Sequence, residues 1–469
     1  MFLGRHSELN ELEKRWASDR FEMGIVYGAR RIGKTSLLKE FVKEKNAFYF
    51  QARLEEEKNN LAAFSREFHL FLGQDLSSVY LSFEDALNDV ARYARQRKMI
   101  FVIDEIAYLC SKSQAMLSTL QFFIDHAFQE TGMLLILSGS NISFMEELLK
   151  SRNSPLYQRA TFQIHLQKML FSEARSFIPS YTPEQQIETL ALFGAHPYYL
   201  GMIRQTLSPE ENIRELLYTK FGTLTDAPAK VLPAGTSASP MYHSLLKVIA
   251  NGKRFSKDIA EAVGQSTGYI SQYLNALIET QAIEKRSSFI KNQKTNYYAV
   301  ADQLLRFWYR FIFEKQDLIE LGYGDSLFRE DLPGIRDFLA RGFEDVAILW
   351  LEEQNLNGRL PCLYEPIRNY VVEKSQLGRS IELDGLAAGY GANAHRLLVM
   401  ECKYRNIPFD KQMLSHLQES VSIFDRYSEM DLYIFSKSGF TDAVAQLDDP
   451  HLHLITPEIM CQENTSPAP

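Results

Sequence analysis

The residues best suited to chemistry near the start of the chain form the pattern Gly28-x-x-x-x-Gly33-Lys34-Thr35. The apolar run MGIVY precedes this pattern, and the helical pattern SLLKEFVKEK follows it. The glycines let the backbone curl so that its N–H groups point at phosphate oxygens, and the helix N-terminus adds a positive dipole. In such a loop the lysine reaches the β and γ phosphates and the threonine hydroxyl ligates Mg²⁺. The spacing therefore predicts a Walker A loop that binds ATP.

A second motif, this one acidic, follows in MIFVIDEI, where an apolar run ends in Asp104 and Glu105. A buried strand that delivers two carboxylates at its C-terminal end is what a Walker B motif requires. We expect Asp104 to hold the Mg²⁺ and Glu105 to orient and deprotonate the attacking water.

Polar residues after the next apolar run complete the predicted nucleotide site. The run ends in LSGSN, so Ser138 and Ser140 could sense the γ phosphate, although a plain turn with Asn141 as a helix cap explains them as well. Arg152 and Arg159 could reach a phosphate in cis or act as a finger on a neighbouring subunit, and surface arginines are the simpler alternative. The predicted cofactor-binding residues are Gly28, Arg30, Arg31, Ile32, Gly33, Lys34, Thr35, Ser36, Asp104, Ser138, Ser140 and Arg159. Lys34 from this list is assigned a catalytic role, as is Glu105. Thr35 and Asp104 are assigned as ligands of the metal ion.

A second group of chemically suited residues lies in RSIELDGLAAGYGANAHRLLVMECKYRN, which reads as a hairpin of two strands. Because side chains alternate along a strand, Glu401 and Lys403 share one face, with Cys402 opposite, and Asp384 shares a face with Glu382. Carboxylates and a lysine on one face need a partner. We predict that Asp384 and Glu401 ligate Mg²⁺ or Mn²⁺, that Lys403 positions or activates a water, and that Glu344 on an upstream helix adds a third ligand. A solvated hairpin with an ordinary Glu/Lys pair is the alternative.

The elements that must position these residues begin with alternating apolar runs and amphipathic stretches, the pattern of βα units and a parallel sheet. We expect strands at 23–28, 47–52, 99–105, 133–140 and 161–166. The predicted fold class is α/β: a parallel-sheet P-loop core with a helical lid, then a winged helix and a mixed α/β domain. The predicted domains are 1–170 (ATPase core), 171–235 (lid), 236–318 (winged helix), 319–460 (nuclease-like) and 461–469 (disordered tail).

The middle of the chain reads as a helix-turn-helix followed by a basic hairpin, or wing. Ser256 is expected to cap one helix, Gly264 to end it, and STGYISQYLNALIET to form the next. If this unit binds DNA, the second helix faces a major groove and the wing holds phosphates. The residues assigned to these contacts are Ser266, Thr267, Tyr269 and Gln272 for the groove and Lys285, Arg286, Lys291 and Lys294 for the wing. A spacer or protein-docking unit is the alternative. The following run, LLRFWYRFIF, is expected to be core.

Composition limits the class of protein. The chain has 469 residues, a net charge of −8 and 45% hydrophobic residues, as expected for several globular domains. Its acidic balance argues against indiscriminate coating of nucleic acid, although a local basic surface could still bind it. The four cysteines are far apart and read as reduced thiols, and no apolar stretch is long enough to span a membrane. We therefore expect a cytoplasmic protein.

The segments FLGRHSELNELE, GARRIGKTSLLKEF, FVIDEI, LILSGSN and GAHPYYL occur in this order. Together they resemble the P-loop ATPase family common in archaea, a branch of the AAA+ and STAND-like ATPases. The resemblance implies a five-stranded ATPase core with a helical lid. It also implies that Gly4, Arg5 and Glu8 lie near the adenine and that the lid residues His196 and Pro197 touch the nucleotide, with histidine where many relatives carry glycine.

The order Glu344, Asp384, Glu401-x-Lys403 resembles the PD-(D/E)XK nuclease superfamily, with IELD in place of the proline of that motif. Its pairing with the preceding domains is similar to a C-terminal domain of uncharacterised function in the same archaeal-type family. We therefore expect an ATPase whose nucleotide state controls a DNA-acting, metal-dependent nuclease-like module. A homo-oligomer of the whole chain is a further partner that this interpretation allows. The alternative is a STAND-like switch that recognises a protein partner through an inactive nuclease fold.

Overall fold

The computed structural model describes residues 2–74, 79–110, 115–227, 239–287, 289, 296–372 and 379–462. The chain forms two compact units, Met1–Lys168 and Met169–Pro469, which are described separately. The predicted division into four domains and a tail is finer than these two units and stays a prediction. Its boundary near residue 235 and residues 463–469 of the predicted tail lie outside the described residues.

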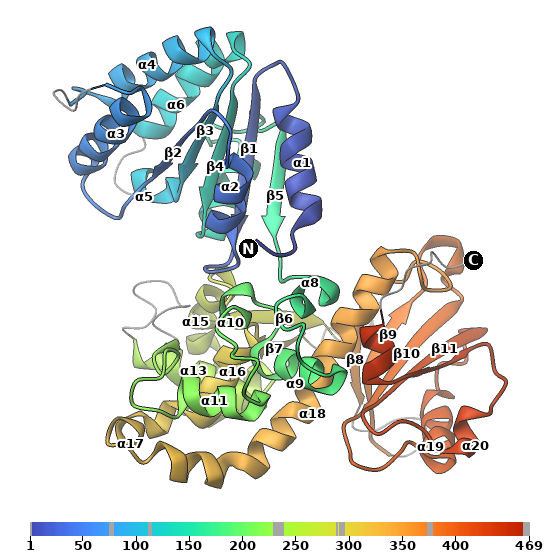
Figure 1. The fold of residues 1–469 in the computed structure, drawn as a ribbon. Coiled ribbons are helices and arrows are strands. Elements are labelled where there is room, and N and C mark those ends of the chain that lie inside the picture. The colour runs from blue at the N-terminus through green and yellow to red at the C-terminus, as the bar shows by residue number, and fades with distance from the viewer. Residues whose placement is uncertain are drawn as a thin grey trace. The chain divides into compact units, whose positions relative to one another are not determined.

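The first unit is a five-stranded parallel sheet with the strand order β2-β3-β4-β1-β5 (Figure 1). Its strands are β1 (Glu22–Gly28), β2 (Ala47–Gln51), β3 (Ile100–Asp104), β4 (Leu134–Gly139) and β5 (Phe162–Leu166). Its helices are α1 (His6–Trp16), α2 (Lys34–Val42), α3 (Glu57–Phe71), α4 (Phe83–Gln96), α5 (Ile106–Cys110), α6 (Ala115–His126), the 3₁₀ turn η1 (Phe128–Glu130) and α7 (Ile142–Lys150).

Burial on both faces explains why the five strands read as apolar runs in the sequence. All seven residues of β1 are buried, as expected for a strand inside a parallel sheet covered by helices on each side. One buried cluster joins the sheet to α3, α4 and α6, and a second joins it to α1 and α2. The predicted α/β class with a parallel P-loop sheet is thereby confirmed.

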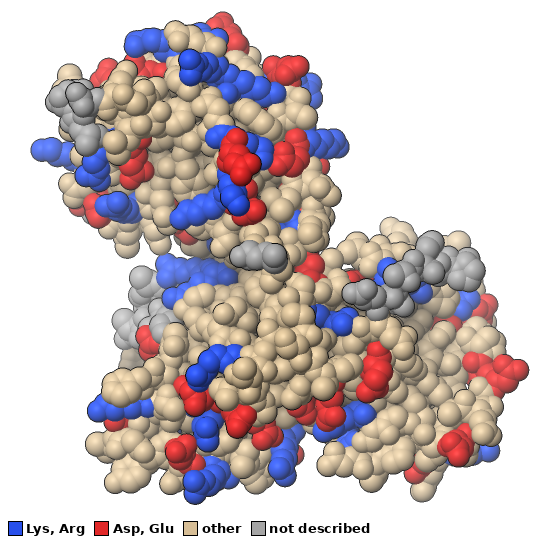
Figure 2. Space-filling model, viewed as in Figure 1, with Lys and Arg blue, Asp and Glu red and all other residues tan. Residues whose placement is uncertain are grey.

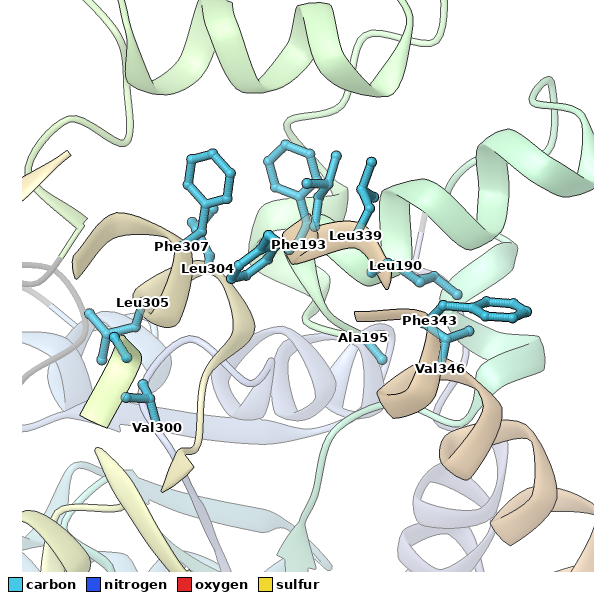
Figure 3. Packing of buried hydrophobic residues seen from close by; sticks show 14 of the residues in the cluster. Leu190, Phe193, Ala195, Val300, Leu304, Leu305, Phe307, Leu339, Phe343 and Val346 are labelled. Atoms are coloured by element: carbon cyan, nitrogen blue, oxygen red, sulfur yellow. The ribbon is translucent and has the colours of Figure 1, made fainter. Parts of the chain in front are cut away.

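The second unit begins with helices and continues into a long helix that crosses the unit. The helices are α8 (Phe171–Arg175), α9 (Pro183–Phe193), α10 (Pro197–Leu200), α11 (Pro209–Leu217), α16 (Gln303–Phe311), the 3₁₀ turn η3 (Phe313–Lys315), α17 (Gln316–Glu320) and α18 (Gly324–Leu356). Apolar side chains from α9, α16 and α18 meet in one cluster that also includes residues of the C-terminal sheet (Figure 3). The run 304–313 is buried within this cluster except for Arg306, Arg310 and the partly buried Phe313, which packs against the cluster, so the prediction that the run forms core is confirmed.

The described residues of the range 239–300 form three helices and an antiparallel pair of strands, named here the helix–hairpin segment. Its elements are α13 (Pro240–Ala250), α14 (Ser256–Ala262), α15 (Thr267–Glu279), β6 (Ile283–Ser287) and β7 (Asn296–Val300). The prediction that Ser256 caps α14 is wrong, because Phe255 occupies the cap position and Ser256 is the first helical residue. Gly264 follows the end of α14 with a φ of 67°, a conformation that glycine adopts readily. The identification of the segment as a winged helix stays a prediction.

The C-terminal part is a mixed five-stranded sheet with the order β12-β11-β10-β9-β8. Its elements are β8 (Arg368–Val372), β9 (Ile381–Ala388), η4 (Gly391–Asn393), β10 (Arg396–Lys403), α19 (Lys411–Val421), β11 (Glu429–Ser436), α20 (Asp442–Ala445), β12 (Leu452–Ile455) and α21 (Pro457–Cys461). Strands β8, β9 and β10 pair antiparallel, whereas β10, β11 and β12 pair parallel. The two faces of β10 alternate between the cluster that contains α18 and a separate cluster that contains α19.

Figure 2 shows charged side chains of both signs interspersed on the visible face of each unit. On the visible face of the first unit they form no large area of one sign. Among the described residues, no helix is long and apolar enough to cross a membrane.

Candidate functional site

The predicted phosphate-binding loop lies between β1 and α2, as the motif requires. Gly28 has a φ of 155° and Gly33 a φ of 100°, conformations that side chains other than glycine rarely adopt. A Cβ atom on Gly28 would lie 2.5 Å from the carbonyl oxygen of Leu166, so the close packing of the loop on β5 also requires glycine there. Arg31 adopts a left-handed conformation as well, with a φ of 63°. The glycines thus make the turn that the sequence predicted.

Lys34 is buried at the start of α2 and is held by the loop itself. Its Nζ donates hydrogen bonds to the carbonyl oxygens of Gly28 and Ala29, each at 2.9 Å. Burial lowers the pKa of this ammonium group, while Glu105 and Asp104 act in the opposite direction. An ammonium group anchored on the loop is placed to meet a phosphate bound in the same loop.

Asp104 ends β3 with no exposed surface, and three donors hold its carboxylate. The hydroxyls of Thr35 and Tyr49 donate to Oδ2 at 2.9 and 2.7 Å, and the Glu105 N–H donates to Oδ1 at 3.1 Å. A hydroxyl and a carboxylate one hydrogen bond apart are the oxygen ligands that Mg²⁺ takes beside phosphate, so Thr35 and Asp104 fit that ion. Bound there with ATP, Mg²⁺ would neutralise phosphate charge.

Glu105 follows β3 in a strained conformation. Its φ of 55° lies in the left-handed region, which costs a residue with a side chain about 1–2 kcal/mol. The carboxylate accepts hydrogen bonds from the N–H and the hydroxyl of Ser140 at 3.0 and 2.9 Å. Ser140 therefore fixes the predicted catalytic base. Ser138 lies on β4 beside Val26 of β1, is fully buried, and its hydroxyl has no hydrogen-bond partner among the described residues.

Two of the arginines that the sequence analysis singled out, Arg5 and Arg159, make hydrogen bonds within the first unit. Arg5 is buried, and its guanidinium donates to the carbonyl oxygens of Ile32 (3.2 Å) and Gln167 (2.6 Å). It therefore ties the phosphate-binding loop to the segment that follows β5. Sequence reasoning did not foresee this role, and the adenine contact expected of Arg5 and Glu8 stays a prediction. Arg159 makes a two-pronged ion pair with Asp125, at 2.8 and 2.7 Å. Its assignment as a finger also stays a prediction.

A pocket of about 540 Å³ opens beside the site at the carboxyl end of β2. Two of the residues that line the pocket also make hydrogen bonds with residues of the predicted nucleotide site. The hydroxyl of Tyr49 donates to Asp104, and the hydroxyl of Tyr108 accepts a hydrogen bond from Arg30 at 3.4 Å. The full lining is Lys39, Tyr49, Gln51, Ala52, Arg53, Glu67 and Tyr108.

The C-terminal carboxylates meet around Asp384. Its Oδ2 accepts the Cys402 N–H at 2.8 Å, and Lys403 on β10 forms an ion pair with Glu401. Burial raises the pKa of Asp384 to about 7, and the charge of Glu401 adds to the rise. Burial likewise raises the pKa of Glu344 to about 9, and here the charge of Asp384 adds to it. Asp384 is thus close enough to be coupled electrostatically to both other predicted ligands.

The predicted three-carboxylate metal set is not assembled in this arrangement. Among the residues that the structure describes, no group of three or more His, Cys, Asp or Glu side chains is placed to hold a metal ion. On β10, Leu398, Met400 and Cys402 belong to the cluster that contains α18, so strand alternation turns Glu401 and Lys403 to the other face. Glu344 lies on α18 itself. The roles of Glu344, Asp384 and Glu401 as metal ligands therefore stay predictions.

The helix–hairpin segment packs against the C-terminal sheet. Phe289 joins the cluster on the α19 side of that sheet, with its ring centroid 6.1 Å from that of Phe424. Tyr297 donates to the side-chain oxygen of Asn369 at 3.2 Å, and the Asn369 amide donates to the backbone carbonyl of Asp384 at 2.7 Å. Arg286, predicted to bind phosphate, is paired with Glu284 at 2.9 Å. Lys285 is exposed, and Lys291 and Lys294 lie outside the described residues.

The exposed face of α15 carries the residues that sequence reasoning assigned to a DNA groove. Thr267, Tyr269 and Gln272 are exposed. Ser266 is exposed too, but its hydroxyl caps the helix by accepting the Tyr269 N–H at 3.2 Å. His196, expected to touch nucleotide from the lid, is buried in the second unit at the start of α10, and its contact stays a prediction.

The loop after β1, the lysine that begins α2 and the two carboxylates that end β3 define the first unit as a P-loop nucleotide-binding ATPase. Comparison with known proteins agrees. Residues 2–203 match the family described as an ATPase domain predominantly from Archaea, and residues 308–416 match one described as archaeal and bacterial proteins of unknown function. The first part of the chain is therefore an archaeal-type ATPase domain, and the later part contains a domain whose family has no known function.

Individual relatives are similar in the same way. The chain is 28% identical to the uncharacterised protein MJECL04 of Methanocaldococcus jannaschii over 87% of this chain and 88% of that one. It is 44% identical to the uncharacterised ATP-binding protein MJ0423 of the same organism over 10% of this chain and 76% of that one. The Walker-type ATPase PABY2304 of Pyrococcus abyssi has a TM-score of 0.50 at 18% identity, covering 66% of this chain and 96% of that one. That likeness concerns the fold.

Proposed function

We propose that the protein hydrolyses ATP in its first unit and that the nucleotide state controls a nuclease-like module of the second unit that acts on DNA. The hydrogen bond between Thr35 and Asp104, with Lys34 on the loop and Glu105 held by Ser140, carries the ATPase part. In this proposal Lys34 meets the phosphates and Glu105 takes the proton of the attacking water. We retain the expectation that the protein acts in the cytoplasm.

The electrostatic coupling of Asp384 on β9 to Glu401 and Lys403 on β10 supports the DNA-acting part. A lysine paired with one carboxylate and a second carboxylate nearby are the groups that a phosphodiester-cleaving site uses to manage charge and water. The exposed polar face of α15 belongs to the segment that packs against this sheet through Phe289 and Tyr297. DNA held on that face would therefore be bound by a segment already joined to the carboxylates.

A partner-recognising switch is the second candidate, and one observation keeps it level with the first. Because the described residues hold no three-ligand metal group, the C-terminal sheet supports docking as readily as cleavage. In that case ATP sets the on and off states of a surface that binds a protein. Arg159 as a finger, and with it a homo-oligomer, belongs to either candidate.

A cleavage assay separates the two candidates. Plasmid, linear and single-stranded DNA are incubated with the full chain and Mg²⁺ or Mn²⁺, with and without ATP. We expect Asp384→Asn to abolish cleavage while ATP hydrolysis continues, and Lys34→Ala to abolish hydrolysis and to change cleavage, because ATP controls the module. Matched controls are the exposed residues Asp448 (Asp448→Asn) and Lys43 (Lys43→Ala), which should behave as wild type.

Absence of cleavage under every condition, with intact ATP hydrolysis, would reject the nuclease and favour the partner-binding switch. Absence of ATP hydrolysis in a protein that binds ATP would reject the ATPase part as well.

A further inference from the structure

Tyr49 is the one donor to the Asp104 carboxylate, among those the structure describes, that comes from outside the Walker A and Walker B motifs. The other two donors are the Thr35 hydroxyl and the Glu105 N–H, which belong to those motifs. Tyr49 comes from β2, which pairs with β3 so that Tyr49 lies beside Val102 and Gln51 beside Asp104. Neither the sequence motifs nor the family descriptions assign it a role.

The geometry of this contact is that of a strong hydrogen bond. The phenol oxygen lies 2.7 Å from Oδ2 of a carboxylate that has no exposed surface. A buried carboxylate is stable only when donors satisfy its oxygens, and hydrogen bonds to a charged group are about twice as strong as neutral ones. Removing the Tyr49 hydroxyl would therefore change how firmly Asp104 is held.

The hydrogen bond from Tyr49 to Asp104 becomes more important when nucleotide and Mg²⁺ are bound. Thr35 and Tyr49 donate to the same oxygen of Asp104. If the Thr35 hydroxyl turns to Mg²⁺, as the motif predicts, it can no longer donate its proton to Asp104 in the same way. Tyr49 is then the side-chain hydroxyl that remains on Oδ2, at the moment when the carboxylate must keep one orientation.

We propose that Tyr49 is a positioning residue of the ATPase site, which orients the Asp104 carboxylate for the Mg²⁺ that accompanies the nucleotide. The residue acts through Asp104 and touches neither phosphate nor water in this role. Its ring packs beside α2 in the cluster that covers one face of the sheet and borders the pocket at the end of β2. Whatever occupies that pocket would lie against the residue that orients Asp104.

The test uses the full chain and measures nucleotide binding, not activity alone. The affinity for a fluorescent ADP analogue is titrated with Mg²⁺ and again in EDTA, and the ratio of the two affinities reports the contribution of the metal. Tyr49→Phe keeps the ring and removes the hydroxyl. We expect it to lower that ratio about 10-fold, the effect of one hydrogen bond to a charged group, with the EDTA affinity unchanged.

Tyr93→Phe is the matched control, because the Tyr93 hydroxyl also donates to a side chain, Asn46, at 3.1 Å but belongs to α4 and touches none of the site residues named above. The same titration in an Asp104→Asn background shows whether the two residues act together. There Tyr49→Phe should have no further effect. A ratio unchanged by Tyr49→Phe, equal losses with Mg²⁺ and in EDTA, or full additivity with Asp104→Asn would each overturn the proposal.

Discussion

Replacing Glu344 with glutamine should stabilise the second unit at alkaline pH. Burial raises the pKa of this carboxyl from its ordinary value of 4.5 to about 9, and the charges of Asp384 and Asp345 add to the rise. The folded chain therefore binds a proton that the unfolded chain releases above pH 4.5. The stability that the protonated group contributes at acidic pH is lost as the pH rises from about 4.5 toward 9. Glutamine carries no proton to lose.

The magnitude follows from this linkage. Each pH unit above the ordinary pKa costs about 1.4 kcal/mol, so at pH 8 the penalty is at most about 5 kcal/mol. The side chain of Glu344 is half-buried, so water still solvates part of its carboxylate and the penalty is smaller than this upper bound. We therefore expect the Glu344→Gln protein to gain about 1–2 kcal/mol of unfolding free energy at pH 8. At pH 5 the two proteins should differ by less than about 0.7 kcal/mol.

Urea unfolding in EDTA measures the difference. Tryptophan fluorescence reports the second unit in a Trp16→Phe background, because the other two tryptophans, Trp308 and Trp350, lie in α16 and α18. Glu330→Gln is the matched control, since Glu330 is exposed on the same helix and should change stability by less than about 0.5 kcal/mol. A Glu344→Gln protein no more stable than wild type at pH 8 would refute the reasoning.

Two further predictions concern single carboxylates. Glu105→Gln should still bind ATP but hydrolyse it about 10² to 10⁴ times more slowly, because the base that Ser140 holds is lost; a decrease of less than tenfold in phosphate release would contradict the assignment. Burial would raise the pKa of Asp431, but hydrogen bonds from His451, Tyr364 and Arg396 outweigh it and hold the pKa below 3.8. Asp431→Asn should therefore lower the unfolding free energy by about 3 kcal/mol at pH 7, and the loss should shrink as the pH falls below 3.8. An equal loss at pH 7 and pH 2 would show that charge is not the cause.

The nucleotide site was predictable as far as its motifs are local. The loop and the strand that ends in Asp104 are each a short segment whose residue types and neighbours fix the conformation, and buried strands leave apolar runs that show their bounds. Tyr49 was not predictable in this way. Its partner lies on another strand, and the contact exists only because β2 pairs with β3 in one particular register. A tyrosine in an otherwise apolar run is a weak signal, because its hydroxyl needs some partner without specifying which.

The C-terminal site was predictable only in part. Strand alternation correctly placed Glu401 with Lys403, because that pattern depends on the backbone alone. Whether Glu344 joins them depends on how α18 packs on the sheet, and this packing is set by contacts distant in sequence. The docking of Phe289 and Tyr297 was missed for the same reason, since the basic residues of the hairpin suggested a solvated surface.

The continuous core of the second unit has a consequence for dissecting the protein. One buried cluster takes residues from Met169 at the start of the unit to Cys461 near its end, and in it α9 packs on α18 and α21 packs on α9. A fragment that starts at residue 319 would leave Phe343 and Trp350 without the α9 and α16 side chains that cover this cluster, and it would lose the hairpin that contacts Asp384 through Asn369. The cut that keeps each core whole lies between Lys168 and Met169. A junction at this place divides none of the buried clusters, whereas a junction near residue 319 divides the cluster that α9, α16 and α18 share.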